Sequence, residues 1–381
     1  MNSIELTEKL VSFPSFVDGK NNERSVSDFL LDFTKEKLTW MESVIQEVSP
    51  GRINILIKDR YPTRLLVVDH VDTVIPGDDW QSDPLVAHKK NGKLFGLGTS
   101  DSKGNIEAFL TALQTFGRTK GLAMLFYVDE EYAFKGMKKF INSDIAASIN
   151  PKVIVSIDGS SSALGIGCRG LVDFIVRIKS PSGHSANPKN CGSIMPLLET
   201  YKAFREWLNK RQGSKLPIAS AQMASVKAGL KIGGDFKHPI FADTGNQIPN
   251  FAEARIEVRT DIGTELQDIK KFWQNALKDF VGISYSFDLL LDYPGYSTTI
   301  EDAKEIVDAI NTELGSTPTL DISKFGYLDM AMLRQKYPNA LLCSFGLGAQ
   351  DAAHKANEYI DINALEKGES VYLRILKTLV K

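Results

Sequence analysis

The stretch LLVVDHVDTVIPG, residues 65–77, decides the expected fold of this chain. Its first four residues are apolar and lead into Asp69, His70, Val71 and Asp72. A continuous apolar run is typical of a strand that is covered on both faces. A strand that only packs has no use for a histidine between two carboxylates at its end. The stretch therefore favours a buried strand that carries a metal ligand to the edge of a sheet.

Strands and helices alternate around this stretch. Sequence patterns predict strands at 52–58, 64–70, 123–128 and 152–158, and a helix at 104–116 that a glycine opens. Strands separated by helices predict a mainly parallel sheet, with ligands at the carboxyl ends of its strands. After Asp292 the alternation returns, with helices at 303–314, near 327–336 and at 362–379, and a strand at 340–346.

The middle of the chain follows a different pattern. Apolar and polar residues alternate at 171–180 and 253–262, a third strand is expected at 283–292, and helices are expected at 193–210 and 266–280. One-faced alternation predicts an antiparallel sheet with helices on one side. We therefore predict an α/β fold with an inserted α+β domain.

The expected domain boundaries follow from this change of pattern. Residues 1–170 and 293–381 form a discontinuous catalytic domain with a mainly parallel sheet, and residues 171–292 form the inserted domain. A chain of 381 residues has room for about two domains at ~100–200 residues each.

Composition excludes several classes of protein. Lys+Arg total 45 and Asp+Glu total 47, so the net charge of −2 argues against non-specific nucleic-acid binding. No run approaches ~18 apolar residues, so no membrane span is expected. The start MNSIELTEKLVSF reads as an amphipathic helix and not as a signal peptide. Cys168, Cys191 and Cys343 are few and widely spaced, which suits a reducing cytoplasm.

Chemically active side chains collect at the predicted strand ends. Because the carboxyl ends of parallel strands meet at one edge, these side chains should converge. Imidazole nitrogen and carboxylate oxygen form the ligand set that zinc accepts. The side chains concerned are His70, Asp72, Asp101, Asp129, Glu130, Glu131, Asp158 and His354.

These blocks carry a family resemblance. The segments HVD (70–72), GLGTSDSKG (96–104), DEE (129–131) and HKANEY (354–359) occur in that order, with Asp158 between the last two. The chain resembles the zinc-dependent family of acetylornithine deacetylases, succinyl-diaminopimelate desuccinylases, aminoacylases, carboxypeptidases and dipeptidases. The resemblance spans nearly the whole chain and implies a catalytic α/β domain interrupted by a lid domain, which often dimerises.

The resemblance implies a site for two zinc ions, for which cobalt or manganese can substitute. His70, Asp101 and Asp158 would hold one zinc ion. Asp101, Glu131 and His354 would hold the other, with Asp101 as the bridging ligand. A shared carboxylate offsets the repulsion between two cations only ~3.5–4 Å apart.

Further roles follow from the same resemblance. Asp72 would accept the remaining N–H of His70, and Glu130 would act as general base on the metal-activated water. In the lid, His184 would stabilise the oxyanion, often in the partner subunit's site. Asn246 and Arg259 would bind the carbonyl and the carboxylate of the substrate.

The sequence departs from the family pattern at several positions. Asp69 replaces the usual glycine before the H-x-D motif, and Ser102 replaces the usual methionine after Asp101. Asp158 stands where deacylases tend to carry glutamate and peptidases aspartate, whereas residues 96–104 resemble acetylornithine deacetylases. Residues 324–333 replace a small, threonine-rich loop, so the substrate pocket is expected to be unusual.

With the family resemblance, the sequence predicts a cytoplasmic two-zinc amidohydrolase that acts on N-acyl-amino acids, and the resemblance implies a homodimer through the lid. A dipeptidase, aminopeptidase or carboxypeptidase with the same metals stays open as the alternative. A non-catalytic binding protein on this fold has no reason to keep all the ligands and Glu130. A nucleotide-dependent enzyme is disfavoured, because GLGTSDSKG is neither a G-x-G-x-x-G motif nor a P-loop.

Overall fold

A computed structural model describes residues 3–187, 192–211, 219–243, 245–320 and 327–380 of the protein. The chain forms two compact units. Unit 1 comprises Met1–Gly167, Thr298–Asp321 and Leu328–Lys381, and unit 2 comprises Cys168–Ser297 and Ile322–Tyr327.

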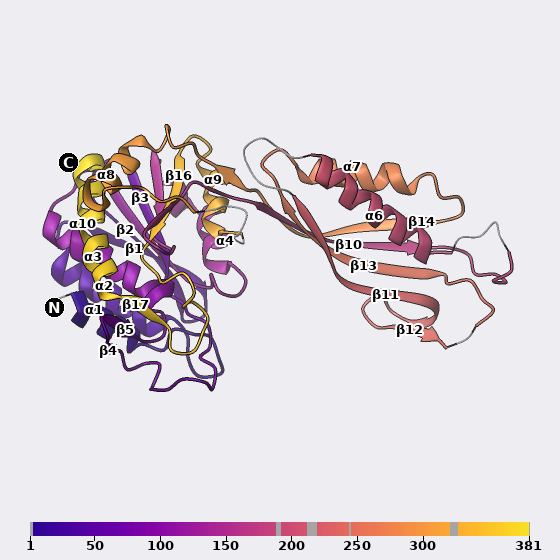
Figure 1. The fold of residues 1–381 in the computed structure, drawn as a ribbon, viewed down its shortest axis with the longest axis horizontal. Coiled ribbons are helices and arrows are strands. Elements are labelled where there is room, and N and C mark those ends of the chain that lie inside the picture. The colour runs from indigo at the N-terminus through magenta and orange to yellow at the C-terminus, as the bar shows by residue number, and fades with distance from the viewer. Residues whose placement is uncertain (1–2, 188–191, 212–218, 244, 321–326, 381) are drawn as a thin grey trace. The chain divides into compact units, whose positions relative to one another are not determined.

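Unit 1 is built on a seven-stranded sheet (Figure 1). Its four central strands, β6, β3, β7 and β16, are mutually parallel, and the flanking strands β1, β2 and β8 pair antiparallel. The prediction of an α/β fold is confirmed, while the antiparallel flanks were not foreseen. The strand order is β1 (Glu42–Ser49), β2 (Arg52–Lys58), β6 (Leu122–Tyr127), β3 (Leu65–His70), β7 (Val153–Ser156), β16 (Leu341–Gly346) and β8 (Ala163–Gly165).

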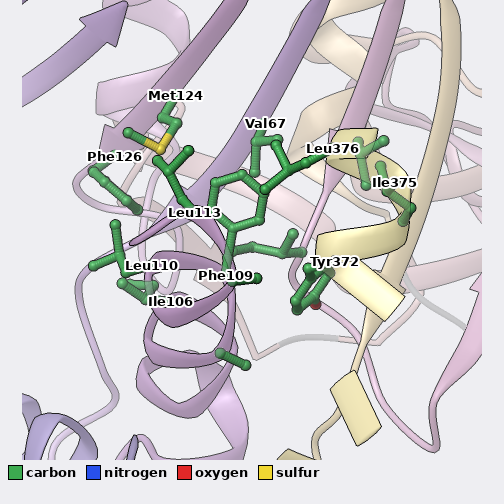
Figure 2. Close-up of a cluster of buried hydrophobic side chains, with 14 of the residues drawn as sticks. Val67, Ile106, Phe109, Leu110, Leu113, Met124, Phe126, Tyr372, Ile375 and Leu376 are labelled. Carbon is green, nitrogen blue, oxygen red and sulfur yellow. The ribbon is translucent and has the colours of Figure 1, made fainter. Parts of the chain in front are cut away.

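Helices cover the sheet because its central strands are apolar on both faces. Every residue of β3 and of β6 is buried. Figure 2 shows Phe109 of α3 among Val67 of β3, Met124 of β6 and Tyr372 of α10. The helices of unit 1 are α1 (Ser3–Val11), α2 (Arg24–Lys37), α3 (Gly104–Phe116), α4 (Lys135–Ile141), α5 (Asp144–Ala147), α8 (Lys304–Leu314), α9 (Leu333–Lys336) and α10 (Ile362–Leu379).

Short elements complete unit 1. The strands β4 (His88–Lys90), β5 (Lys93–Phe95) and β17 (Tyr359–Asp361) form a small antiparallel sheet. The turn Thr99–Lys103, in which Asp101 and Ser102 have non-helical backbone angles, precedes α3. The helix expected near 327–336 is wrong in part: a 3-10 turn at Asp329–Met332 is followed by a single turn, α9, which stops before Tyr337. Tyr337 precedes Pro338, which disfavours helical backbone.

Unit 2 contains a five-stranded antiparallel sheet and two helices (Figure 1). Alternate residues of β10 and β13, such as Phe174 and Ile256, pack with Trp273 of α7 and Phe204 of α6. The one-faced alternation therefore predicted this α+β architecture correctly. The elements are β12 (Pro239–Ala242), β11 (Ser220–Gly234), β13 (Phe251–Thr260), β10 (Gly170–Lys179), β14 (Ser284–Tyr293), α6 (Ile194–Lys210) and α7 (Leu266–Leu277), with β9 (Gly167–Cys168) paired to β15 (Tyr296–Ser297).

Every helix in the described part of the chain is too short or too polar to span a membrane.

Candidate active site and metal centre

The parallel strands place the candidate residues at one edge of the sheet. His70 is the last residue of β3, and Glu130 and Glu131 follow β6. Asp158 follows β7, and His354 lies in the segment after β16. Because β6, β3, β7 and β16 run in one direction, their carboxyl ends lie together.

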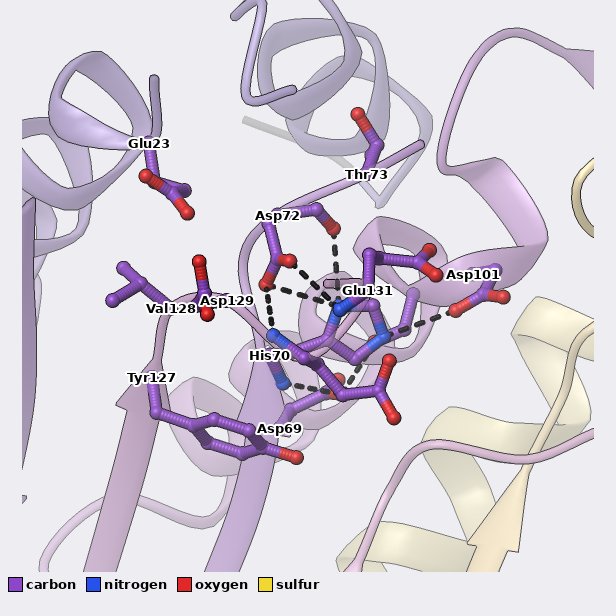
Figure 3. A network of polar contacts seen from close by, with 12 residues as sticks. Glu23, Asp69, His70, Asp72, Thr73, Asp101, Tyr127, Val128, Asp129 and Glu131 are labelled. Carbon is purple, nitrogen blue, oxygen red and sulfur yellow. Dashed lines mark hydrogen bonds and ion pairs between the residues drawn. The ribbon is translucent and has the colours of Figure 1, made fainter. Parts of the chain in front are cut away.

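Asp101 lies between two histidines. Its Oδ1 is 3.0 Å from Nε2 of His70, and its Oδ2 is 3.2 Å from Nε2 of His354. The same His354 nitrogen is 2.9 Å from Oε2 of Glu131. One donor atom each from His70, Asp101 and Glu131 lies within 4.8 Å of the other two, and Figure 3 shows these three side chains together. The structure thus brings four of the predicted ligands into contact.

The donor set fits divalent cations of the zinc type. Two imidazoles and neighbouring carboxylates supply the nitrogen and oxygen ligands that such cations accept. Asp101 turns each of its oxygens to a different imidazole, which is the disposition that a bridging ligand needs. Among the described residues, the three-residue group contains Glu131 and does not include Asp158. The charges of Asp101, Glu131 and both histidines nevertheless act on Asp158.

Electrostatics at this edge favours a cation. Burial opposes a charge on His70, but the hydrogen bond to Asp101 and the negative charges of Asp101 and Asp72 outweigh it and raise the pKa of His70 well above its ordinary value. Hydrogen bonds to Asp101 and Glu131 raise the pKa of His354 to about 10. Burial, and then the charge of Asp101, raise the pKa of Asp158 to about 6. The carboxylates thus hold protons on the imidazoles, and a divalent cation would compete for the same positions.

Asp72 lies beside His70, and its main-chain carbonyl oxygen is nearer to the imidazole than its carboxylate is. Nδ1 of His70 is 3.0 Å from the main-chain carbonyl oxygen of Asp72, whereas the nearest carboxylate oxygen of Asp72 is 3.6 Å away. That longer distance is outside hydrogen-bond range. The Asp72 carboxylate instead accepts the backbone N–H groups of Glu130, at 3.2 Å, and Glu131, at 3.0 Å (Figure 3). Asp72 therefore orients the turn that carries both glutamates.

A buried ion cluster supports the same turn. Nη1 of Arg52 is 2.7 Å from Oδ1 of Asp129, and the other side of the guanidinium pairs with Glu23. The three side chains are at most 9% exposed. Asp129 has a φ of 70°, a left-handed conformation that is uncommon outside glycine. The sequence analysis missed Arg52 and Glu23, because these residues lie far from the motif along the chain.

Glu130, the predicted general base, is partly buried in an acidic environment. Burial, and then the charge of Asp329, raise the pKa of Glu130 well above its ordinary value. Asp329 itself accepts a hydrogen bond from the hydroxyl of Tyr127 at 2.8 Å. Asp329 belongs to the segment 324–333 singled out above, of which residues 324–326 lie outside the described part of the chain.

A family model supports the sequence resemblance. The model of the family described as "Peptidase family M20/M25/M40" matches residues 66–378. The chain belongs to this family.

Named relatives of the M20 chain divide between deacylases and peptidases. The acetylornithine deacetylase of Photorhabdus laumondii is 28% identical, over 94% of this chain and 92% of the relative. The succinyl-diaminopimelate desuccinylase of Helicobacter pylori strain P12 is 25% identical, over 100% of this chain and 99% of the relative. A crystal structure from Bacillus subtilis, described as a dinuclear metal binding peptidase from the M20 family, has a TM-score of 0.66 at 14% identity and covers 99% of this chain and 98% of its own. Membership makes the chain a hydrolase of the amidohydrolase and peptidase type.

The M20 chain has a further buried carboxylate beside the site. Glu358 accepts backbone N–H groups from Gly98 at 2.8 Å, Ser100 at 2.8 Å and Asp101 at 3.0 Å. Glu358 is four residues after His354, so its carboxylate links the segments that carry two predicted ligands. The sequence shows this glutamate within HKANEY, but nothing in the motif reveals its partners.

Three predicted site residues belong to unit 2. His184 and Asn246 are exposed on adjoining loops, joined by a bridge between His184 and Gln247 and by a hydrogen bond from Ser185 N to the carbonyl oxygen of Asn246. Arg259 on β13 donates to Glu257 at 2.9 Å and is 29% exposed. The structure brings His184 and Asn246 together, and the action of all three residues on a substrate stays a prediction.

Proposed function

We propose that this M20 protein is a two-zinc amidohydrolase that cleaves the amide bond of N-acyl-amino acids, as an acetylornithine deacetylase does. The observation that carries the proposal is Asp101, with one imidazole at each carboxylate oxygen. The deacetylase and desuccinylase relatives, which align over most of their own length, support an acylated amino acid as substrate. The dinuclear metal site named for the B. subtilis structure supports a pair of ions.

In this proposal, His70, Asp101 and Asp158 hold one zinc ion, and Asp101, Glu131 and His354 hold the other. The bound ions would lower the pKa of a water molecule and polarise the substrate carbonyl. Asp72 serves through its carbonyl group, which fixes the His70 ring, and through its carboxylate, which fixes the glutamate turn.

Glu130 is the proposed general base. It takes a proton from the attacking water and passes it to the leaving amine. The raised pKa of Glu130 makes its carboxylate a stronger proton acceptor than an ordinary glutamate, which suits a general base.

Unit 2 would supply the remaining contacts. We propose that His184 stabilises the oxyanion, that Asn246 binds the substrate carbonyl and that Arg259 binds a free carboxylate. A homodimer through unit 2 and a cytoplasmic location complete the proposal. Cys343 is a buried free thiol, which suits a reducing compartment.

One observation favours a peptidase as the second candidate. Asp158 follows the peptidase pattern of the family, and the B. subtilis structure is named a peptidase. A dipeptide, or a peptide with a free carboxylate, would then occupy the same site. Cobalt or manganese would serve in place of zinc in either case.

Two measurements test the proposal. Dialysis against a chelator should abolish hydrolysis, and zinc or cobalt should restore it; full activity after complete metal removal would refute the metal mechanism. Purified protein should then be assayed with N-acetylornithine, N-succinyl-diaminopimelate and a panel of dipeptides. Release of acetate or succinate supports the deacylase, whereas cleavage confined to the dipeptides replaces it with the peptidase.

A further inference from the structure

Asp69 and Ser102, the two departures from the family pattern that adjoin predicted ligands, contact each other. Ser102 Oγ donates to Oδ1 of Asp69 at 2.5 Å, and both side chains are buried. Asp69 directly precedes His70, and Ser102 directly follows Asp101. The hydrogen bond therefore joins the chain beside one ligand to the chain beside the other.

This hydrogen bond closes a ring of contacts. On one side, Nε2 of His70 is 3.0 Å from Oδ1 of Asp101. On the other side, Oδ1 of Asp69 accepts both the Ser102 hydroxyl and, at 3.0 Å, the backbone N–H of His70. The end of β3 and the turn at Thr99–Lys103 are thus held together at two points. Ligands that are held before a metal arrives lose less freedom when it binds.

Both departures are needed for the link. A glycine at position 69 has no acceptor, and a methionine at position 102 has no hydroxyl donor. The second carboxylate oxygen of Asp69, Oδ2, is buried and has no hydrogen-bond partner among the described residues. Burying an incompletely paired carboxylate costs free energy, so packing alone gives no reason for an aspartate here.

We propose that Asp69 is a positioning residue that, through Ser102, holds His70 and Asp101 in the arrangement that binds a divalent cation. The inference rests on the metal-binding part of the proposed function. It adds to that function a side-chain link between the two segments that carry these ligands.

Cobalt titration of the metal-free full-length protein tests the inference. Asp69→Ala and Ser102→Ala should each weaken cobalt binding by about 10–100-fold, the usual effect of removing a partner of a metal ligand. The double variant should bind no more weakly than the weaker single variant, because both changes break one link. Asp69→Asn keeps the accepting oxygen and should retain cobalt affinity and the visible absorption spectrum of the bound ion.

Asp59 offers a matched control. It is also buried, and it accepts the Thr119 hydroxyl at 2.7 Å and the Gly121 N–H at 2.8 Å, but at the amino end of β6. Asp59→Ala should lower the melting temperature of the metal-free protein and leave cobalt affinity unchanged. A purely structural role for Asp69 would give this same result.

The outcomes separate the inference from the proposed function. Unchanged cobalt affinity in Asp69→Ala and Ser102→Ala, with a wild type that binds the metal, would overturn the inference alone. Loss of one cobalt ion in Asp69→Asn would also overturn it, because Asp69 would then be a ligand itself. A wild type that binds neither zinc nor cobalt would overturn the proposed function and the inference with it.

Discussion

At the scale of single residues, Glu130 and Glu131 are neighbours in the chain with different surroundings. Glu131 contacts His354 at 2.9 Å. The pKa of Glu130 is instead influenced by the nearby charges of Asp329, His70 and Asp158. The sequence alone could not decide which glutamate binds metal and which acts as base. The contact with His354 supports Glu131 as the ligand.

Substituting each glutamate in turn should separate the two roles. Glu130→Gln should reduce turnover by about 10²–10⁴-fold with metal content unchanged, because only the proton acceptor is lost. Glu131→Gln, the matched variant one residue away, should lower the metal content measured by atomic absorption. Equal metal loss in both variants, or normal turnover in Glu130→Gln, would contradict the assignment.

His354 gives the metal-free protein a predictable pH dependence. The pKa of His354 is about 10 in the folded state because of Asp101 and Glu131, and about 6.5 is the ordinary value expected when unfolded. The protonated ring therefore stabilises the fold fully below pH ~6.5, and this contribution is lost as the pH rises towards about 10. His354 is 54% exposed, so the effect is reduced by solvent.

Thermal denaturation in chelator checks this pH dependence. Between pH 6.5 and 10 the melting temperature should fall further for the wild type than for His354→Asn. The exposed His238, which lies in unit 2, supplies a control in His238→Asn, which should follow the wild type. Parallel pH curves for the wild type and His354→Asn would show that the imidazolium contributes nothing.

At the scale of secondary-structure elements, helix α3 carries a buried acid. Glu107 accepts the Thr111 hydroxyl at 2.6 Å, and burial, with a contribution from Glu369 of α10, raises the pKa of Glu107 to about 8. Below pH ~4.5 the carboxyl is protonated in both the folded and the unfolded state. As the pH rises towards about 8, only the unfolded state ionises freely, so the fold is progressively destabilised.

Removing this acid should therefore stabilise the protein in a pH-dependent way. Glu107→Gln should raise the melting temperature by a few degrees at pH 8 and by much less at pH 4.5. Glu366→Gln, at an exposed position of α10, is the control and should change little. A lower melting temperature for Glu107→Gln at pH 8 would mean that the carboxylate is ionised and paired in the fold.

Elements whose pattern is continuous along the chain could be predicted from the sequence. The apolar run of β3 and the periodicity of α3 are both local signals, and their bounds agree with the prediction to within a residue. Strand β1 has a single buried residue and was missed, and the pairing of Tyr359 in β17 with Phe95 in β5 joins distant segments. Such pairings depend on the fold and leave no local trace.

The candidate site follows the same division. A strand end or a motif marks His70, His354 and the glutamate pair 130–131, so their position at one edge of the sheet could be predicted. Which of the two glutamates contacts His354 could not be predicted. The Asp72 carbonyl, the Arg52 cluster and the Glu358 carboxylate could not, because each contact joins backbone or side-chain groups that only the folded chain brings together.

At the scale of the whole molecule, each unit has a hydrophobic core of its own. The core of unit 1 lies between the seven-stranded sheet and its helices, and that of unit 2 gathers Phe174, Phe204 and Trp273 between its sheet and its two helices. All five predicted metal ligands belong to unit 1. Metal should therefore act on the stability of one unit only.

Calorimetry of the full chain should show this asymmetry. A ligand at 100 times its Kd stabilises the folded form that binds it by about 2.7 kcal/mol, so saturating zinc should raise the transition of unit 1 and leave that of unit 2 in place. Phe174→Ala should lower the transition temperature of unit 2 alone. It should reduce the free energy of unfolding of that unit by about 3–5 kcal/mol, since it removes a ring packed against Trp273 and Phe204. The transition that Phe174→Ala lowers belongs to unit 2. If zinc shifted that transition, metal ligands would lie in unit 2, and the proposed ligand set would be contradicted: His70, Asp101, Glu131, Asp158 and His354.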